Sequence, residues 1–217
     1  MSPLETLLTR SQAFVEHLFL MLGRIEEWDD RPRALACASS CELSIEHCQA
    51  VYVLFASDLP NAACVAMRAQ YEAVLRAAWL QHCANPDEVN RLLQPLTLET
   101  EQGAKNLPGA LKMLSALQAL LVVEPGIKGL VQPLTEAHAV LWKSLNSFAH
   151  AGIHALHRTE FGFPEPLVMD TVKNSNVLAH FAARLMVRTG VPVELHHTVD
   201  RAWQGFEDCL PPVRPMS

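Results

Sequence analysis

The chain has 217 residues, of which 50% are hydrophobic and 18% are charged, and its formal net charge is −6. This composition excludes an intrinsically disordered chain, and the negative charge argues against broad binding to a nucleic-acid backbone, which needs many Lys and Arg. The sequence has no uncharged apolar run of roughly 18 residues and no signal-peptide pattern at its start, so we predict a cytoplasmic protein with no membrane partner.

The N-terminal part of the chain has the periodicity of long helices. A Ser-Pro-Leu-Glu capping pattern begins a predicted helix over about 3–22. Pro32 introduces a second predicted helix that runs to about Ala56, and the turn at 57–61 starts a third over about 61–84. Two long helices joined by a short turn predict an antiparallel hairpin.

The remaining elements are predicted to be shorter helices separated by Pro, Gly and polar stretches. They are a short helix ending near Pro95, a loose loop over 96–108, helices over about 109–122, 134–157, 167–189 and 193–208, and a flexible tail over 209–217. No strand alternation or internal repeat is evident. The predicted fold class is therefore all-α: one domain over 1–217, built as a bundle of about seven or eight helices on long antiparallel hairpins.

A charged stripe follows one side of the predicted third helix. Arg68, Glu72, Arg76 and Trp79 fall within about 80° of one another on a helix, and the rest of that helix is apolar nearly all round. One interpretation is a surface ladder in which Glu72 pairs with both arginines. The other is a cleft in which the arginines bind a phosphate or carboxylate, Glu72 orients them and Trp79 forms a wall.

A second polar stripe is predicted on the helix over about 134–157. Lys143, Ser147, His150, His154 and His157 fall within about 80° of one another if this helix is continuous. The histidines could be surface or capping residues near a helix C-terminus. Alternatively, His150 and His154 are catalytic acid–base groups, with Ser147 and His157 as ligand contacts.

The two stripes together resemble uncharacterised bacterial all-helical families that are loosely related to the abortive-infection and HEPN-like bundles. An R-x-x-x-E-x-x-x-R helix followed by Trp, and a later S-F-x-H-x-G-x-x-H segment, carry the resemblance over roughly residues 40–158 through Arg68, Glu72, Arg76, Trp79, Ser147, His150, Gly152 and His154. The resemblance implies a helical bundle, often dimeric, in a group whose members include metal-independent ribonuclease toxins used in defence. The late helix has no arginine before its histidines, whereas the HEPN nuclease motif has one.

We therefore expect the two striped helices to face each other across a polar cleft. In the first hypothesis the arginines bind an anionic ligand, with RNA phosphate as one candidate, and His150 or His154 acts as acid or base in a homodimer without cofactor. In the second, the protein is a non-enzymatic interaction or antitoxin-like module with a protein partner, and the polar residues only specify helix pairing. In the third, His150 and His154 bind a single metal ion with a third ligand from Glu72, Glu46 or His47.

Overall fold

The computed structural model describes residues 1–104 and 106–212, and within these residues all regular structure is helical. The α-helices are α1 (Pro3–Leu22), α2 (Pro32–Ala56), α3 (Pro60–His82), α4 (Pro86–Leu93), α5 (Leu98–Ala104), α6 (Ala110–Leu120), α7 (Lys128–Ala149), α8 (Ile153–Phe161), α9 (Glu165–Gly190) and α10 (His197–Asp200). The predicted all-α bundle is confirmed. No helix in the described part of the chain combines the length and apolar character needed to cross a membrane.

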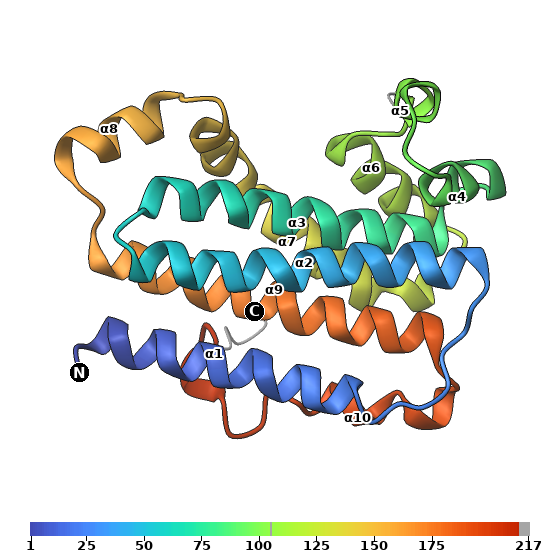
Figure 1. The fold of residues 1–217 in the computed structure, drawn as a ribbon, viewed down its shortest axis with the longest axis horizontal. Coiled ribbons are helices and arrows are strands. Elements are labelled where there is room, and N and C mark those ends of the chain that lie inside the picture. Colours follow the sequence, from blue (N-terminus) through green and yellow to red (C-terminus); the bar gives the residue numbers. More distant parts are fainter. Residues whose placement is uncertain (105, 213–217) are drawn as a thin grey trace.

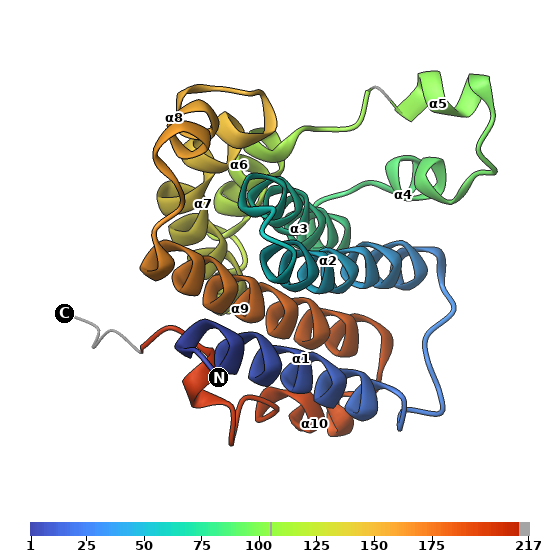
Figure 2. The same ribbon diagram turned by 60° about the vertical axis from the view of Figure 1, so that its left-hand side comes forward.

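The α2–α3 hairpin forms the centre of the bundle. The two helices run side by side in opposite directions, as predicted, and α9 lies along α2 with α1 on its other side (Figures 1 and 2). Helix α3 also contacts α6, α7 and α9, so other helices enclose it as its apolar composition predicts. The buried apolar side chains of these helices form one connected core.

A buried polar network fixes α9 against the central hairpin. Ser175 Oγ in α9 donates to Gln70 Oε1 in α3 at 2.7 Å, and Gln70 Nε2 donates back to the Ser175 carbonyl at 2.9 Å. The amide of Asn176, the next residue, donates to Ser11 Oγ in α1 at 2.8 Å and to the Cys209 carbonyl at 2.8 Å. The Tyr52 hydroxyl from α2 donates to Asn176 Oδ1. These bonds define one register for four helices, because a shift would leave buried polar groups unpaired.

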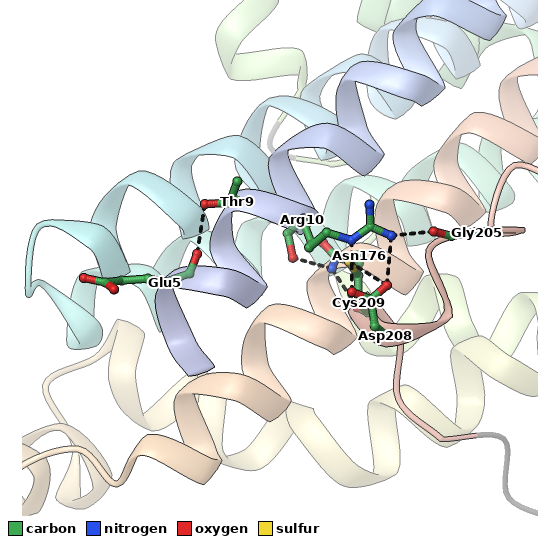
Figure 3. Close-up of polar contacts among 8 residues, drawn as sticks. Glu5, Thr9, Arg10, Asn176, Gly205, Asp208 and Cys209 are labelled. Carbon is green, nitrogen blue, oxygen red and sulfur yellow. Dashed lines mark hydrogen bonds and ion pairs between the residues drawn. The ribbon is translucent and has the colours of Figure 1, made fainter. Parts of the chain in front are cut away.

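The C-terminal segment packs on α1 without the helix predicted over 193–208. That prediction is wrong: the structure has only short helical turns there, of which α10 is the longest. Arg10 holds the segment instead, through bonds to both carboxylate oxygens of Asp208 at 3.0 Å and to the Gly205 carbonyl (Figure 3). Gly205 has a φ of +82°, which other residues adopt rarely, so the chain turns where a helix would continue. In the predicted tail, Cys209 is buried; residues 213–217 lie outside the described residues.

The predicted loose loop over 96–108 contains a further helix, α5. Thr97 and Thr100 start it by exchanging bonds: each backbone N–H donates to the other's hydroxyl, at 2.8 and 3.2 Å. Ser and Thr make such bonds at helix starts as readily as in loops, which is why the polar composition was misleading.

The helix predicted over 134–157 is two helices, because the chain turns at 150–152. Helix α7 starts earlier than predicted, with Pro133 inside it, and ends at Ala149. Ala151 has a φ of +50°, and the Gly152 N–H then donates to the Ser147 carbonyl at 2.6 Å in a Schellman-type bond. The Ser147 hydroxyl accepts from the His154 N–H at 3.0 Å and so caps the start of α8.

Gly152 is required at this turn, because a Cβ there would lie 2.6 Å from Ser147 Oγ. We predict that Gly152→Ala lowers the free energy of unfolding by about 1–3 kcal/mol, measured by urea denaturation. Gly129→Ala is the matched control: it lies in the first turn of α7 with open space around the added methyl and should be neutral or stabilise by up to about 1 kcal/mol. Equal effects of the two substitutions would contradict this account of the turn.

Candidate functional site

The charged stripe of α3 packs against one face of α7. The residues concerned are Arg68, Tyr71 and Glu72 from α3 and His138, Trp142 and Asn146 from α7, which we call the α3–α7 seam. Arg68 reaches Asn146, whereas Tyr71, one turn further along α3, reaches His138 and the Leu134 carbonyl. The two helices are therefore antiparallel at the seam, and this register determines which predicted residues can meet.

Arg68 is held by three groups. Its Nε donates to Asn146 Oδ1 at 2.7 Å, its Nη1 donates to Glu72 Oε2 at 2.8 Å, and its guanidinium lies 4.9 Å from the centre of the Trp142 ring. The Arg68 and Glu72 side chains are 22% and 28% exposed, so the ion pair is shielded but not removed from solvent. The i, i+4 ion pair between Arg68 and Glu72 that the sequence predicts is thus present, and Arg68 also bonds Asn146 of α7.

Aromatic rings complete the seam next to Arg68. The His138 ring stacks on Trp142 with centroids 5.0 Å apart and an interplanar angle of 20°, and Tyr71 lies 6.0 Å from Trp142. The Tyr71 hydroxyl donates to the Leu134 carbonyl at 3.0 Å. Burial lowers the pKa of His138 and raises that of Tyr71, so both favour their neutral forms. This part of the seam is a packed contact between helices.

Arg76 differs from Arg68 and Glu72, which bond each other, because one of its side-chain nitrogens has no hydrogen-bond acceptor among the described residues. It lies one turn beyond Glu72 and is partly buried, and its Nη1 atom is shielded from solvent without a hydrogen-bond acceptor among the described residues. Burial lowers the pKa of Arg76, and the charge of Glu72 opposes that shift. We call Arg68, Glu72 and Arg76 the α3 ladder. The ladder contains two cations and one anion, and the Nη1 donor of Arg76 has no acceptor among the described residues.

Trp79 does not form a wall beside the ladder. Its side chain is 4% exposed and belongs to the hydrophobic core. Two surface cavities, of about 410 and 230 Å³, lie elsewhere, one between α6 and α7 and one near the start of α9; neither is lined by a predicted arginine or histidine.

The three histidines do not share one helix face. His150 caps the C-terminus of α7, whereas His154 and His157 are on α8, and all three side chains are exposed. The predicted stripe from Lys143 to His157 is wrong because the turn at 150–152 rotates α8 relative to α7. Ser147, predicted as a ligand contact, instead uses its hydroxyl to cap α8.

The register of the seam separates Arg76 from the histidines. Arg76 lies eight residues beyond Arg68 along α3, and His150 lies four residues beyond Asn146 in the opposite direction along α7. At 1.5 Å per residue, Arg76 and His150 are roughly 18 Å apart along the helix axes. Within the ladder Arg68 is thus the residue nearest to His150 along the helix axes, and Arg76 is the farthest from it.

The break between α7 and α8 also removes the basis of the metal hypothesis. His150 and His154 have i, i+4 spacing, but they are not on a common helix, so the spacing does not direct both imidazoles to one ion. No cluster of three His, Cys, Asp or Glu side chains suited to a metal ion occurs among residues 1–104 and 106–212.

The α7 partners of Arg68 were not predicted from the sequence. Trp142 and Asn146 are four residues apart and so lie on one side of the helix. This spacing is the one feature of the sequence that could have indicated a shared contact. As an isolated aromatic residue Trp142 is typical of a core position, and Asn146 does not stand out beside the histidines. Their role depends on which turn of α3 meets which turn of α7.

The fold and site define an all-α protein with a charged seam between two helices of the bundle. Comparison with protein-family models matches residues 41–212 to a family of unknown function, DUF6988. The protein belongs to this family, and the matched range contains the seam, the ladder and the turn before α8. Searches of curated proteins and of solved structures each returned no match.

We predict that Arg68 and Asn146 are energetically coupled. Arg68→Met and Asn146→Ala should each lower the free energy of unfolding by about 1–3 kcal/mol, because each leaves a shielded polar group without its partner. A double-mutant cycle by urea denaturation should give a coupling energy of about 0.5–2 kcal/mol. Strict additivity would show that the 2.7 Å contact does not stabilise the seam.

Proposed function

We propose that the protein binds an anionic group, such as a phosphate or carboxylate, at the Arg76 end of the α3 ladder. The observation that carries this proposal is the shielded Nη1 atom of Arg76, which has no acceptor among the described residues. Buried polar groups in native proteins are usually hydrogen-bonded, and the exceptions call for an explanation such as a ligand, an ion or ordered water. A guanidinium group is well matched to planar or tetrahedral oxyanions.

The charges of the ladder support the same proposal. Glu72 is bonded to Arg68 at 2.8 Å, so Arg76 supplies the excess positive charge. Withdrawing this guanidinium from water is unfavourable, and a bound anion would offset that cost. The chain as a whole carries a charge of −6, so we expect attraction to a discrete anionic group rather than a long-range field for nucleic acid.

A finer proposal follows from the resemblance to HEPN-like defence proteins. The anion would then be an RNA phosphate, and the protein would be a metal-independent ribonuclease. His150 is the better candidate for acid–base catalysis than His154, since it lies one turn beyond Asn146, the α7 residue that bonds Arg68, whereas His154 lies on α8. RNA that reached both Arg76 and His150 would have to extend along the seam.

The second candidate function is a non-enzymatic interaction module. The observation in its favour is that Arg68 is already bonded by Asn146 and Glu72, as expected for residues that specify helix pairing. In that case the protein would neither respond to small anions through Arg76 nor cleave RNA, and its activity would lie in a stoichiometric complex.

Phosphate should stabilise the protein through Arg76. We expect the melting temperature to rise with inorganic phosphate relative to chloride at equal ionic strength, because a ligand that binds only the folded state stabilises it. Without phosphate, Arg76→Met should be at least as stable as the unmodified protein, because it removes an unpaired shielded charge, and it should lose the specific response.

Arg24→Met is the matched control for the phosphate experiment, since it removes the same charge from an exposed position on another part of the chain. It should retain the full response and thereby correct for the general effect of phosphate on protein stability. If Arg76→Met responded to phosphate as strongly as Arg24→Met, the proposed anion site would be wrong.

The finer proposal predicts cleavage of total bacterial RNA by the purified protein in the presence of chelator. His150→Ala should reduce the rate by at least about a hundredfold, the lower end of typical acid–base contributions, whereas His154→Ala should have little effect. No cleavage by any variant would favour the interaction module, and equal loss in both variants would remove the special role of His150.

A further inference from the structure

Glu72 lies between two arginines at equal spacing along α3. Arg68 precedes it by four residues and Arg76 follows it by four, so both side chains are neighbours of Glu72 on the helix surface. In an isolated helix a glutamate pairs better with a basic residue four positions after it than with one four positions before it. The local chemistry of α3 therefore favours a pair between Glu72 and Arg76.

The structure has the opposite pair. Glu72 Oε2 accepts from Arg68 Nη1 at 2.8 Å, and within residues 1–104 and 106–212 the carboxylate makes no ion pair with Arg76. The Nη1 atom of Arg76 is shielded from solvent and has no acceptor in this part of the chain. Contacts from outside α3 must therefore outweigh the preference of the isolated helix.

Helix α7 supplies these contacts through Arg68. Asn146 Oδ1 accepts from Arg68 Nε at 2.7 Å, and the guanidinium lies 4.9 Å from the centre of the Trp142 ring. Because two groups of α7 fix the guanidinium, its Nη1 atom is held ready for the Glu72 carboxylate, and little further side-chain freedom is lost when the pair forms. The seam thus determines which arginine Glu72 bonds.

We infer that Arg68 is a positioning residue for the anion site: it holds the Glu72 carboxylate away from Arg76 and so leaves the Arg76 guanidinium available to an external anion. The inference rests on the proposed function, because it concerns the same site. Without Arg68, the Glu72 side chain would rotate toward Arg76 and pair with it in the favoured orientation. The carboxylate would then compete with the anion as a ligand tethered to the protein.

This role couples helix packing to anion affinity. A change that separates Asn146 from Arg68 would release the hold on Glu72, and the affinity of Arg76 for an anion would fall although neither Asn146 nor Arg68 touches that anion. The contact between α3 and α7 is therefore a point at which a movement of α7 would regulate the site.

A double-mutant cycle in phosphate affinity tests the role of Arg68. Nitrogen-15 NMR titration would give the dissociation constant of inorganic phosphate for the unmodified protein, Arg68→Met, Glu72→Gln and the double variant. Arg68→Met should weaken binding by about two- to sixfold more in the presence of Glu72 than in the Glu72→Gln background, because only the glutamate can occupy Arg76 as a competing anion.

The cycle separates positioning from charge. Loss of the Arg68 charge alone would weaken binding by the same factor in both backgrounds. Glu46→Gln removes an exposed carboxylate from α2, so it is the matched control for net charge and should not rescue Arg68→Met. Asn146→Ala leaves every charge in place; it should also weaken binding, and Glu72→Gln should rescue it. Circular dichroism should show an intact fold for each variant.

Stability without phosphate tests the movement of Glu72 separately. Arg76→Met should not destabilise the unmodified protein, in which Glu72 is bonded to Arg68. In the Arg68→Met background the same substitution should lower the melting temperature by about 1–3 °C, because it removes the new pair between Glu72 and Arg76.

Two results would overturn the inference while the anion site stands. They are an equal effect of Arg68→Met on phosphate affinity in both backgrounds, and an effect of Arg76→Met on the melting temperature that does not depend on Arg68. If the unmodified protein showed no saturable binding of phosphate at Arg76, the proposed function would fail and this role of Arg68 with it, so the two failures can be told apart.

Discussion

The orientation of α3 depends on two hydrogen bonds between Gln70 and Ser175. Both groups are fully buried, so rotation of α3 would leave an amide and a hydroxyl unpaired inside the core. Arg68 lies on nearly the opposite side of α3 from Gln70. The buried pair therefore directs the charged ladder toward α7 and the surface, and the charged contacts of the seam depend on it.

Asn176 and Arg76 differ in how completely their shielded polar atoms are hydrogen-bonded. The side-chain amide of Asn176 is bonded by groups from α1, α2 and the C-terminal segment, as expected for a network that specifies the fold. Arg76 has a shielded nitrogen with no acceptor among the described residues. We propose that a bound anion supplies the acceptor that the described residues do not give to Arg76.

Local signals in the sequence were sufficient for most helices but not for the site. The capping box at Ser2, the Pro and polar breaks and the spacing of apolar residues give α1 to α4, and i, i+4 spacing gives the Arg68–Glu72 pair. The end of α7 was missed because it depends on a left-handed Ala151, a conformation that alanine does not signal. The partners of Arg68 were missed because helix register is a property of the packed core rather than of either helix.

In our proposal Arg76 binds the anion, whereas Arg68 is a structural residue. Nitrogen-15 NMR of the arginine side chains during titration with inorganic phosphate tests it most directly. We predict a saturable shift of the Arg76 resonances with little change at Arg68, whose donors are engaged by Asn146 and Glu72. Resonances of Arg76 that do not move, or that move no more than those of exposed arginines such as Arg24, would contradict the account.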